Sequence, residues 1–485
     1  MRFTFWRSMR AAIACMALVP AMGVSVSAAP PGFAAAPAPT TGSVPRPNVL
    51  FIVVDDLTKA LACYGFPVVQ TPNVDRLAQR AIRFDRAYCQ YPVCSPSRVS
   101  FLSGRRPERT GMFGNEGSSR TPQLKDAVFL PEHFRKQGYF TGRLGKVFHI
   151  GRDVPECWDV TEEGTPNNAI IYQPSEVQKL GLEDRVVRAG RLEGGGGEGN
   201  NWTVLRGGEE QLVDWRIGTR VAELIDDHGN GEKPFFIACG FRRPHLPHLA
   251  PQSYFDTYDP AGVPMPLDAP VRYRSIKLQP SESDTREGMR SYLACVTFMD
   301  KQLGRVLDAL DRGNRWERTI VVLLGDNGYH LGSRGGFWGK GLGYEESCGV
   351  PLLVAMPGRT TADTCSRLVE YVDLYPTLVE CCGLPGAAGL DGRSIRPLLE
   401  RPDAEWDHPA FSMTARQGKP AVLAVSTERY RLIENPGGDV ELYDLKTDPH
   451  EWKNLAEDAA HAEALARLRS LAKEHRAKFW KVWEE

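Results

Sequence analysis

Four stretches of the chain are continuously apolar, without the alternation of polar and apolar residues that a half-exposed strand shows. A strand covered on both faces has this pattern, and such strands are typical of the parallel sheets of α/β proteins. The pattern therefore predicts buried strands of one large sheet at NVLFIVVDD (48–56), PFFIACGF (234–241), TIVVLLGDNG (319–328) and VPLLVAMPG (350–358).

Helical patterns separate these strands. The segment TPNVDRLAQRAIRF begins with Thr71 as the expected N-cap and Pro72 in the first turn, and a second, long helical segment spans residues 286–312. Strand and helix alternate along the chain. This alternation predicts an α/β fold with a large mixed, mostly parallel sheet flanked by helices.

The pattern changes twice along the chain, which divides it into parts. Residues 160–215 are polar and contain EGGGGEGNNW, as expected of a variable insertion or lid within a catalytic α/β domain at 47–385. The residue pattern of 386–485 predicts a smaller C-terminal α+β subdomain. Its predicted elements are two antiparallel strand regions and a terminal helix, at 421–434, 440–449 and 457–482.

The N-terminus has the layout of a secretory signal. Residues 1–10 contain three arginines and no acid, an apolar run follows, and small residues precede a predicted cleavage after Ala28 or Ala29. The apolar run is short for a membrane span, so no stable membrane insertion is expected. Residues 29–46 are rich in alanine and proline and predict a disordered spacer. The predicted location is secreted or periplasmic.

Charge and cysteine content exclude few functions or partners. The chain has 59 Lys and Arg against 60 Asp and Glu, so no nucleic-acid partner is expected. The cysteines that remain after the signal are scattered and form no metal-type pair. Their disulfide connectivity and the oligomeric state cannot be read from the sequence.

Two predicted strands end in oxygen-rich pairs. Asp55 and Asp56 end the first strand, and Asp326 and Asn327 end the third. Ligands of open α/β sheets bind outside the carboxyl ends of the strands, so the two pairs are expected to converge on one cation. Three carboxylates and an amide suit Ca²⁺ or Mg²⁺ better than Zn²⁺. The alternative is ordinary turn and capping chemistry, which is common for Asp after a strand.

Cys94 lies in PVCSPSRVSFLSGRRP, just before a predicted helix. Helix N–H groups and Arg98 would point at its side chain, and such a place binds anions. A cysteine there is either a thiolate nucleophile of lowered pKa or an ordinary buried or disulfide-bonded residue. The segment alone leaves these alternatives open.

Cys94-Ser95-Pro96-Ser97-Arg98 resembles the C-x-P-x-R signature of the type I sulfatases, members of the alkaline phosphatase superfamily. Further segments resemble that family in the same order along the chain, from about residue 47 to 456. They are NVLFIVVDDL (48–57), GKVFHIG (145–151), FRRPHLPHLAP (241–251), GDNGYHLG (325–332), WGKGLGYEESCGVPLL (338–353) and LYDLKTDPHEWKNLA (442–456).

The resemblance implies an alkaline-phosphatase-like fold and a sulfatase mechanism. A formylglycine-generating enzyme would oxidise Cys94 to Cα-formylglycine, whose hydrate offers two hydroxyls on one carbon. One hydroxyl attacks sulfur, and the other later loses its proton as the aldehyde re-forms and sulfate leaves. One Ca²⁺ would be bound by the modified Cys94 together with Asp55, Asp56, Asp326 and Asn327.

The same resemblance assigns the remaining catalytic roles. Arg98 would hold the formylglycine hydroxyl, Lys146 and Lys340 would grip sulfate oxygens, His149 would take the hydrate proton, and His245 would protonate the leaving alcohol. Taken without the motifs, the plainer interpretation is favoured, in which a lysine such as Lys146 is a solvated charge and the histidines are packed imidazoles. His248 and His330 fit that plainer interpretation.

Within the family, GKVFH, GFRRPHLP and SGRRP resemble the iduronate-2-sulfatase branch and its bacterial relatives. This implies exo-removal of a 2-O-sulfate from a uronic acid of a glycosaminoglycan. Candidates to meet the sugar carboxylate are Arg105, Arg106, Arg242 and Arg243. The segment LGSRG (331–335) departs from relatives that have Glu-His there. Three alternatives stay open: a sulfatase for algal or other polysaccharides, a phosphonate or phosphodiester hydrolase, and a non-catalytic glycan-binding relative.

Overall fold

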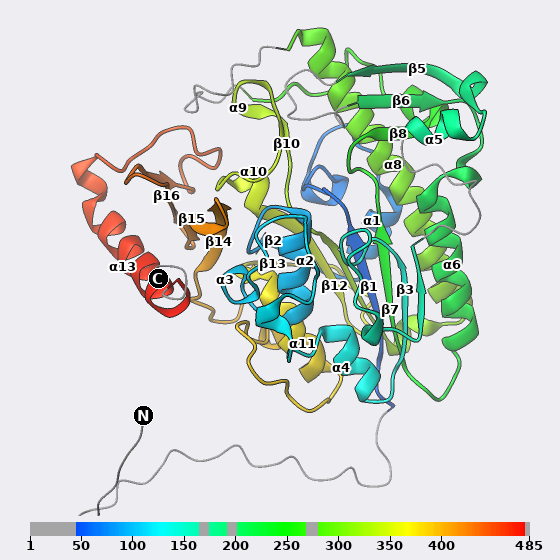
Figure 1. Cartoon of the computed structure of the whole chain (residues 1–485), viewed down its shortest axis with the longest axis horizontal. Coiled ribbons are helices and arrows are strands. Elements are labelled where there is room, and N and C mark those ends of the chain that lie inside the picture. The colour runs from blue at the N-terminus through cyan, green and yellow to red at the C-terminus, as the bar shows by residue number, and fades with distance from the viewer. Residues whose placement is uncertain (1–44, 164–173, 192–200, 268–279, 481–485) are drawn as a thin grey trace, which may run out of the picture. The chain divides into compact units, whose positions relative to one another are not determined.

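The main sheet has eight strands in the order β13-β2-β12-β9-β1-β7-β3-β4 in the computed structural model, which describes residues 45–163, 174–191, 201–267 and 280–480 (Figure 1). At its centre β1 (Asn48–Val54) lies between β7 (Phe235–Phe241) and β9 (Thr319–Gly325), and it is parallel to both. The strands predicted at 48–56, 234–241 and 319–328 are thus direct neighbours. The predicted signal and most of the spacer lie outside the described residues.

The outer strands make the sheet mixed. On one side β12 (Gly349–Ala355) is antiparallel to β9 and to β2 (Ile82–Tyr88), and β13 (Asp363–Glu370) is parallel to β2. On the other side β3 (Phe140–Gly145) and β4 (Val160–Glu162) continue the parallel order. The predicted fold class, a mixed and mostly parallel sheet, is confirmed.

Helices cover both faces of the sheet, which explains the continuous apolar runs. Leu50, Ile52 and Val54 of β1 pack in one core cluster, and Val49, Phe51 and Val53 pack in the other. The first cluster includes α1 (Pro72–Ala78), α6 (Val213–His228) and α8 (Glu282–Arg312). The second includes α2 (Cys94–Ser103), α4 (Leu130–Lys136) and α11 (Leu374–Cys381). Because both faces are buried, no polar alternation is possible.

Smaller elements surround this core. The predicted insertion contributes β4 to the main sheet, and its β5 (Val186–Arg191) and β6 (Asn201–Leu205) form a small sheet with β8 (His248–Pro251). The role of residues 160–215 as a lid stays a prediction. The other short elements are α3 (Pro107–Thr110), α5 (Pro174–Lys179), α7 (Gln252–Asp256), β10 (His330–Gly332), α9 (Ser333–Gly336), β11 (Phe337–Gly339), α10 (Glu345–Cys348) and α12 (Arg396–Glu400).

The C-terminal part contains a separate four-stranded antiparallel sheet. Its strands are β14 (Ala410–Arg416), β15 (Lys419–Ser426), β16 (Tyr430–Glu434) and β17 (Val440–Asp444), in sequence order. The last helix, α13 (Ala462–Phe479), packs on this sheet and is shorter than predicted. The subdomain boundary at residue 386 stays a prediction. Among the described helices, none has the length and apolarity that a membrane crossing requires.

Thr71 is the N-cap residue of α1 and Pro72 lies in its first turn, as predicted, but the Thr71 side chain does not cap the helix. Thr71 Oγ1 accepts a hydrogen bond from the amide of Ala62 at 3.1 Å and makes no cap contact with its own helix. Instead Asp300 of α8 accepts the amides of Asn73 and Val74 with Oδ1, at 3.0 and 2.7 Å. A carboxylate from a distant helix therefore satisfies the first turn of α1, and it ties α1 to α8.

Asp300→Ala is expected to lower the free energy of unfolding by about 2–4 kcal/mol, because it leaves the buried amide of Val74 and the half-buried amide of Asn73 without an acceptor. Asp300→Asn keeps one acceptor oxygen and should lose less. Asp308→Ala on the same helix is the control, since the ion pair of Asp308 with Arg76 is exposed and should contribute about 0.5 kcal/mol or less. Urea unfolding followed by circular dichroism measures all three. Equal losses for the Asp300 and Asp308 alanine variants would contradict the capping role.

Candidate active site

The two oxygen-rich pairs lie together at the carboxyl edge of the main sheet. Asp55 and Asp56 follow β1, Asp326 and Asn327 follow β9, and Val54 is in register with Gly325. The amide of Asp56 donates to Asp326 Oδ1 at 2.9 Å, and Asn327 Nδ2 donates to Asp56 Oδ1 at 2.8 Å. All four residues are buried. Parallel neighbouring strands thus bring the predicted ligands to one place.

Cys94 is the first residue of α2, and its thiol faces this cluster. Its Sγ lies 4.0 Å from Asp56 Oδ1 and 2.8 Å from Lys340 Nζ. Burial raises the pKa of the Cys94 thiol to about 12, although Lys146 and Lys340 pull it down. The thiol is not disulfide-bonded. An unmodified Cys94 is therefore protonated at neutral pH, which disfavours a simple thiolate nucleophile.

Arg98 lies one turn further along α2 and is fully buried. Its Nη2 donates to Asp55 Oδ1 at 2.9 Å and its Nε to Asp326 Oδ2 at 2.8 Å, while Nη1 donates to the carbonyls of Lys146 and Val147. These contacts account for four of the five guanidinium N–H donors. Burial alone would lower the pKa of Arg98, but Asp326 and Asp55 raise it above its usual value. Arg98 thus cross-links the two acidic pairs.

Lys146 and His149 follow the end of β3, beside the acids. Lys146 Nζ lies 2.5 Å from Asp55 Oδ2. Burial, and then the charge of Lys146, lowers the pKa of His149 to about 4, so its imidazole is neutral near pH 7. His149 Nδ1 is buried and has no hydrogen-bond partner among the described residues. A neutral imidazole with a free nitrogen is suited to accept a proton.

His245 and Lys340 complete the cluster from two further loops. His245 follows β7, and its Nε2 lies 3.8 Å from Asp56 Oδ2. Burial lowers the pKa of His245 well below its usual value, and Lys146 and Lys340 lower it further, against the opposing effect of Asp55. Lys340 Nζ contacts Asp56 Oδ1 as well as Cys94 Sγ. Every residue predicted for the site therefore lies in one cluster.

The donor atoms of the cluster fit a hard cation. Ligand atoms of Asp55, Asp56, Cys94 and His245 all lie within 4.8 Å of one another. Asn327 Oδ1 is buried and has no hydrogen-bond partner among the described residues, as expected of an atom whose partner is an ion. Carboxylate and amide oxygens are the donors that Ca²⁺ and Mg²⁺ prefer. His245 joins this group, whereas the sequence motifs assigned it only to proton transfer.

Three of the four arginines proposed for the sugar carboxylate are misplaced for that role. Arg105 and Arg106 follow the C-terminal end of α2, and ten helical residues at 1.5 Å each put them roughly 15 Å from Cys94. Arg106 is also ion-paired with Glu370. Arg243 is buried and donates to the carbonyls of His245 and Leu249. For Arg105 and Arg106 the expectation was wrong because α2 carries the chain away from Cys94, although both residues follow Cys94 closely in sequence. Arg242 remains.

Other residues of the motifs have structural roles. His330 Nδ1 shares a hydrogen bond with Ser333 Oγ at 3.1 Å, and His248 Nδ1 with Ser291 Oγ at 2.7 Å. Sequence reasoning missed Tyr292 of α8, whose hydroxyl donates to the carbonyl of Asp56 at 2.9 Å. No motif marks Tyr292, because its partner is 236 residues away. It fixes the chain just beyond β1.

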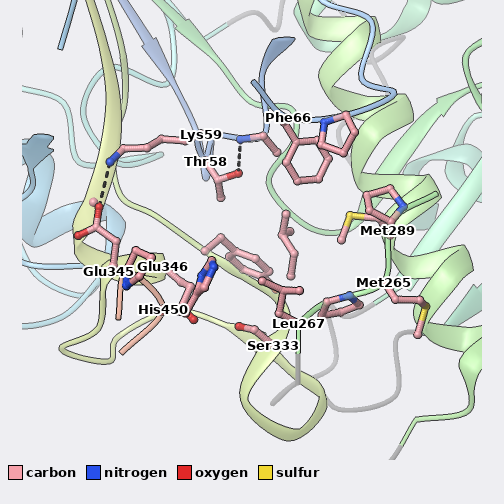
Figure 2. A pocket seen from close by; sticks show the side chains of 18 residues that line it. Thr58, Lys59, Phe66, Met265, Leu267, Met289, Ser333, Glu345, Glu346 and His450 are labelled. Carbon is pink, nitrogen blue, oxygen red and sulfur yellow. Dashed lines mark hydrogen bonds and ion pairs between the residues drawn. The ribbon is translucent and has the colours of Figure 1, made fainter. Parts of the chain in front are cut away.

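A cavity of about 540 Å³ lies outside the cluster, and no residue of the cluster lines it (Figure 2). Its walls include Thr58 and Tyr329, each two residues beyond one of the oxygen-rich pairs. Lys59 also lines it and is ion-paired with Glu345 at 2.9 Å. The remaining walls are largely apolar and include Phe66, Met265, Leu267, Met289 and Leu331.

Comparisons with known proteins agree with this site. The sulfatase family matches residues 47–384, and the C-terminal region of N-sulphoglucosamine sulphohydrolase matches residues 333–478. A sulfatase of Formosa agariphila is 31% identical over 450 residues, covering 88% of this chain and 86% of that protein. Iduronate 2-sulfatase of Homo sapiens is 30% identical over 467 residues, covering 84% and 80%.

Among solved structures, the phosphonate monoester hydrolase of Agrobacterium radiobacter has the same fold, with a TM-score of 0.73 at 22% identity. The structural alignment covers 90% of this chain and 96% of the hydrolase chain. At that identity the likeness concerns the fold alone. The family match spans the strands and loops that bring Asp55, Cys94, Lys146, His245 and Asp326 together. The chain therefore belongs to the sulfatase family, and it is a sulfuric ester hydrolase.

Proposed function

We propose that the protein removes 2-O-sulfate from a uronic acid at the end of a sulfated glycosaminoglycan, using Cα-formylglycine made from Cys94 and one bound Ca²⁺. The observation that supports the chemistry is the position of Cys94, with its Sγ between Lys340 and the carboxylates of the cluster. The observation that supports the substrate is the 30% identity to iduronate 2-sulfatase over most of the chain.

The residues of the cluster have separate tasks in this proposal. Lys146 and Lys340 bind the sulfate oxygens and offset the negative charge that builds on them as the ester breaks. Their ion pairs with Asp55 and Asp56 support this assignment, because they place both amino groups beside the proposed cation ligands. Asp55, Asp56, Asp326 and Asn327 hold the cation. A hydrate at position 94 would supply the nucleophilic hydroxyl, and a cation held by these residues would favour its deprotonated form.

Two histidines move protons. His149 accepts the proton of the second hydrate hydroxyl through its unpartnered nitrogen, and His245 gives a proton to the departing alcohol. Without a ligand His245 is held neutral by burial and by the lysines. A sulfate ester bound beside it adds negative charge, which favours the protonated imidazole.

Recognition of the uronate falls to Arg242. Arg242 is half-buried and directly follows β7, at the start of the loop that contains His245. Its carbonyl accepts the amide of His245 at 3.0 Å, so its backbone lies next to that of the proposed proton donor. A guanidinium there is suited to a bidentate contact with a sugar carboxylate.

The cavity beyond Thr58 and Tyr329 offers little to a second sulfated sugar, in keeping with the proposed removal from a chain end. Among the described residues that line it, the only lysine or arginine is Lys59, and Glu345 already neutralises it. A second sulfated sugar would find apolar walls there, which do not compensate the cost of desolvating its charges. We also propose that the chain is exported and that a formylglycine-generating enzyme acts on it during maturation.

Sulfate release from a panel of sulfated sugars tests the substrate. The panel holds 2-O-sulfated uronate disaccharides, 6-O- and N-sulfated glucosamine, sulfated galactose and an aryl sulfate, with phosphate and phosphonate esters as matched competitors. The enzyme is first checked by peptide mass for formylglycine at position 94. We expect release from the 2-O-sulfated uronates at a kcat/KM at least about 100-fold above the others, a difference of roughly 2.7 kcal/mol in transition-state binding. Arg242→Ala should raise KM for these substrates and not for the aryl sulfate.

Other outcomes would point elsewhere. Preference for sulfated galactose would place the enzyme among sulfatases of algal polysaccharides. Faster turnover of phosphonate esters would favour the alternative that the Agrobacterium fold likeness leaves open. Peptides with an unmodified thiol at Cys94 and no turnover would favour a glycan-binding protein.

A further inference from the structure

Asp214, near the start of α6, is a fully buried carboxylate outside every motif that marks the active site. Its Oδ1 accepts the amide of Arg242 at 2.7 Å, and its Oδ2 accepts the amide of Arg243 at 2.8 Å. Charge-assisted hydrogen bonds to two consecutive amides fix a peptide in both position and orientation. Asp214 therefore holds the first peptides of the loop that follows β7.

That loop contains His245, and the contacts continue to it. The carbonyl of Arg242 accepts the amide of His245 at 3.0 Å, which forms a turn. The guanidinium of Arg243 donates to the carbonyls of His245 and Leu249, at 2.9 and 3.1 Å. The backbone of His245 is thus positioned from two sides by residues whose own amides are bound by Asp214.

We propose that Asp214 is a positioning residue that aims the His245 imidazole at the leaving oxygen of the sulfate ester. The proposal rests on the proposed role of His245. As the S–O bond breaks, its electron pair goes to the leaving oxygen, which takes the proton of the His245 imidazolium, and the imidazole becomes neutral. Displacing a catalytic group by about 1 Å can cost roughly 100-fold in rate, so loss of the Asp214 contacts matters although Asp214 touches no substrate.

The test compares two esters that differ in how much they need that proton. 4-Nitrophenyl sulfate releases a stable anion without protonation, whereas unsubstituted phenyl sulfate releases a poorer leaving group. Asp214→Asn keeps the shape and loses one acceptor, because its amide NH₂ faces one of the two backbone N–H groups. We expect kcat to fall by less than about 3-fold on 4-nitrophenyl sulfate and by about 30-fold or more on phenyl sulfate, with KM nearly unchanged.

Two further variants make the result decisive. His245→Ala should show the same selectivity with a larger loss, and Asp227→Asn, at an exposed position of the same helix, should change neither rate. Asp214→Glu retains the carboxylate but shifts it, so it should show a weaker form of the same pattern, and it replaces Asp214→Asn if that variant does not fold.

The losses measured on the two esters distinguish failure of the proposed Asp214 role from failure of the proposed His245 role. A selective loss in His245→Ala with an equal loss on both esters in the Asp214 variants would overturn the positioning role, since it would mean that Asp214 serves the fold alone. An unselective loss in His245→Ala would remove the proposed role of His245, and the inference about Asp214 with it. Selective losses in both would establish the inference.

Discussion

Replacing Cys94 with alanine is expected to abolish sulfate release, with a loss of about 10⁴-fold or more in kcat. The variant retains the four other cation ligands, both lysines and both histidines, but it has no group at position 94 that can bind the cation or attack sulfur. Cys94→Ser should be equally inactive unless it is converted to the aldehyde, because a single hydroxyl cannot re-form a carbonyl to expel sulfate. Sulfate release is measured by ion chromatography, and the state of residue 94 by peptide mass.

A second buried thiol provides the control. Cys365 of β13 is also fully buried, in the core cluster that includes α2, and Cys365→Ala removes a similar volume far from the acids. It should keep activity within about 3-fold and lose only some stability. Turnover above a tenth of wild type by Cys94→Ala, or full activity of a wild-type preparation whose peptides carry only the thiol, would contradict the formylglycine proposal.

Strand positions were predictable from the sequence where burial leaves a strong local signal. The runs at β1, β7 and β9 are apolar throughout because helices cover both faces of the central sheet. β12 has the same apolar run, but its antiparallel direction is set by how the chain returns to the sheet, which composition does not record. β13 was not predicted at all, because three of its eight residues are polar and exposed and interrupt the apolar pattern.

At the site, too, the contacts between segments that are distant in sequence could not be predicted. The acids were found because a strand end in sequence is also a strand end in space. The prediction for Arg105 and Arg106 was wrong because a helix separates them from Cys94, although Cys94 lies only eleven and twelve residues earlier in the sequence. Asp214 and Tyr292 act through backbone groups 28 and 236 residues away. Backbone atoms have no sequence signature, so only the folded structure identifies such contacts.

Arg98→Ala is expected to lower both stability and activity, and Arg106→Ala to lower stability alone. Both arginines belong to the same buried stretch of chain, and each is paired with buried carboxylates: Arg98 with Asp55 and Asp326, Arg106 with Glu370. Removing one partner of a buried pair leaves an uncompensated charge and costs about 3–5 kcal/mol. Urea unfolding should therefore give similar losses for the two variants.

Activity separates them, because only Arg98 holds the cation ligands. Without it, Asp55 and Asp326 repel each other, and the geometry that Ca²⁺ requires is lost, so kcat should fall by about 1,000-fold or more in protein that is still folded. Arg98→Lys keeps the charge but not the planar fork that bridges two carboxylates, so it should recover stability more than activity. Folded Arg106→Ala should retain activity within about 3-fold, and its Ca²⁺ affinity, measured by calorimetry, should equal that of wild type. A folded Arg98→Ala enzyme with more than a tenth of wild-type turnover would mean that the acids hold their positions without the cross-link, and that the role of Arg98 is confined to stability.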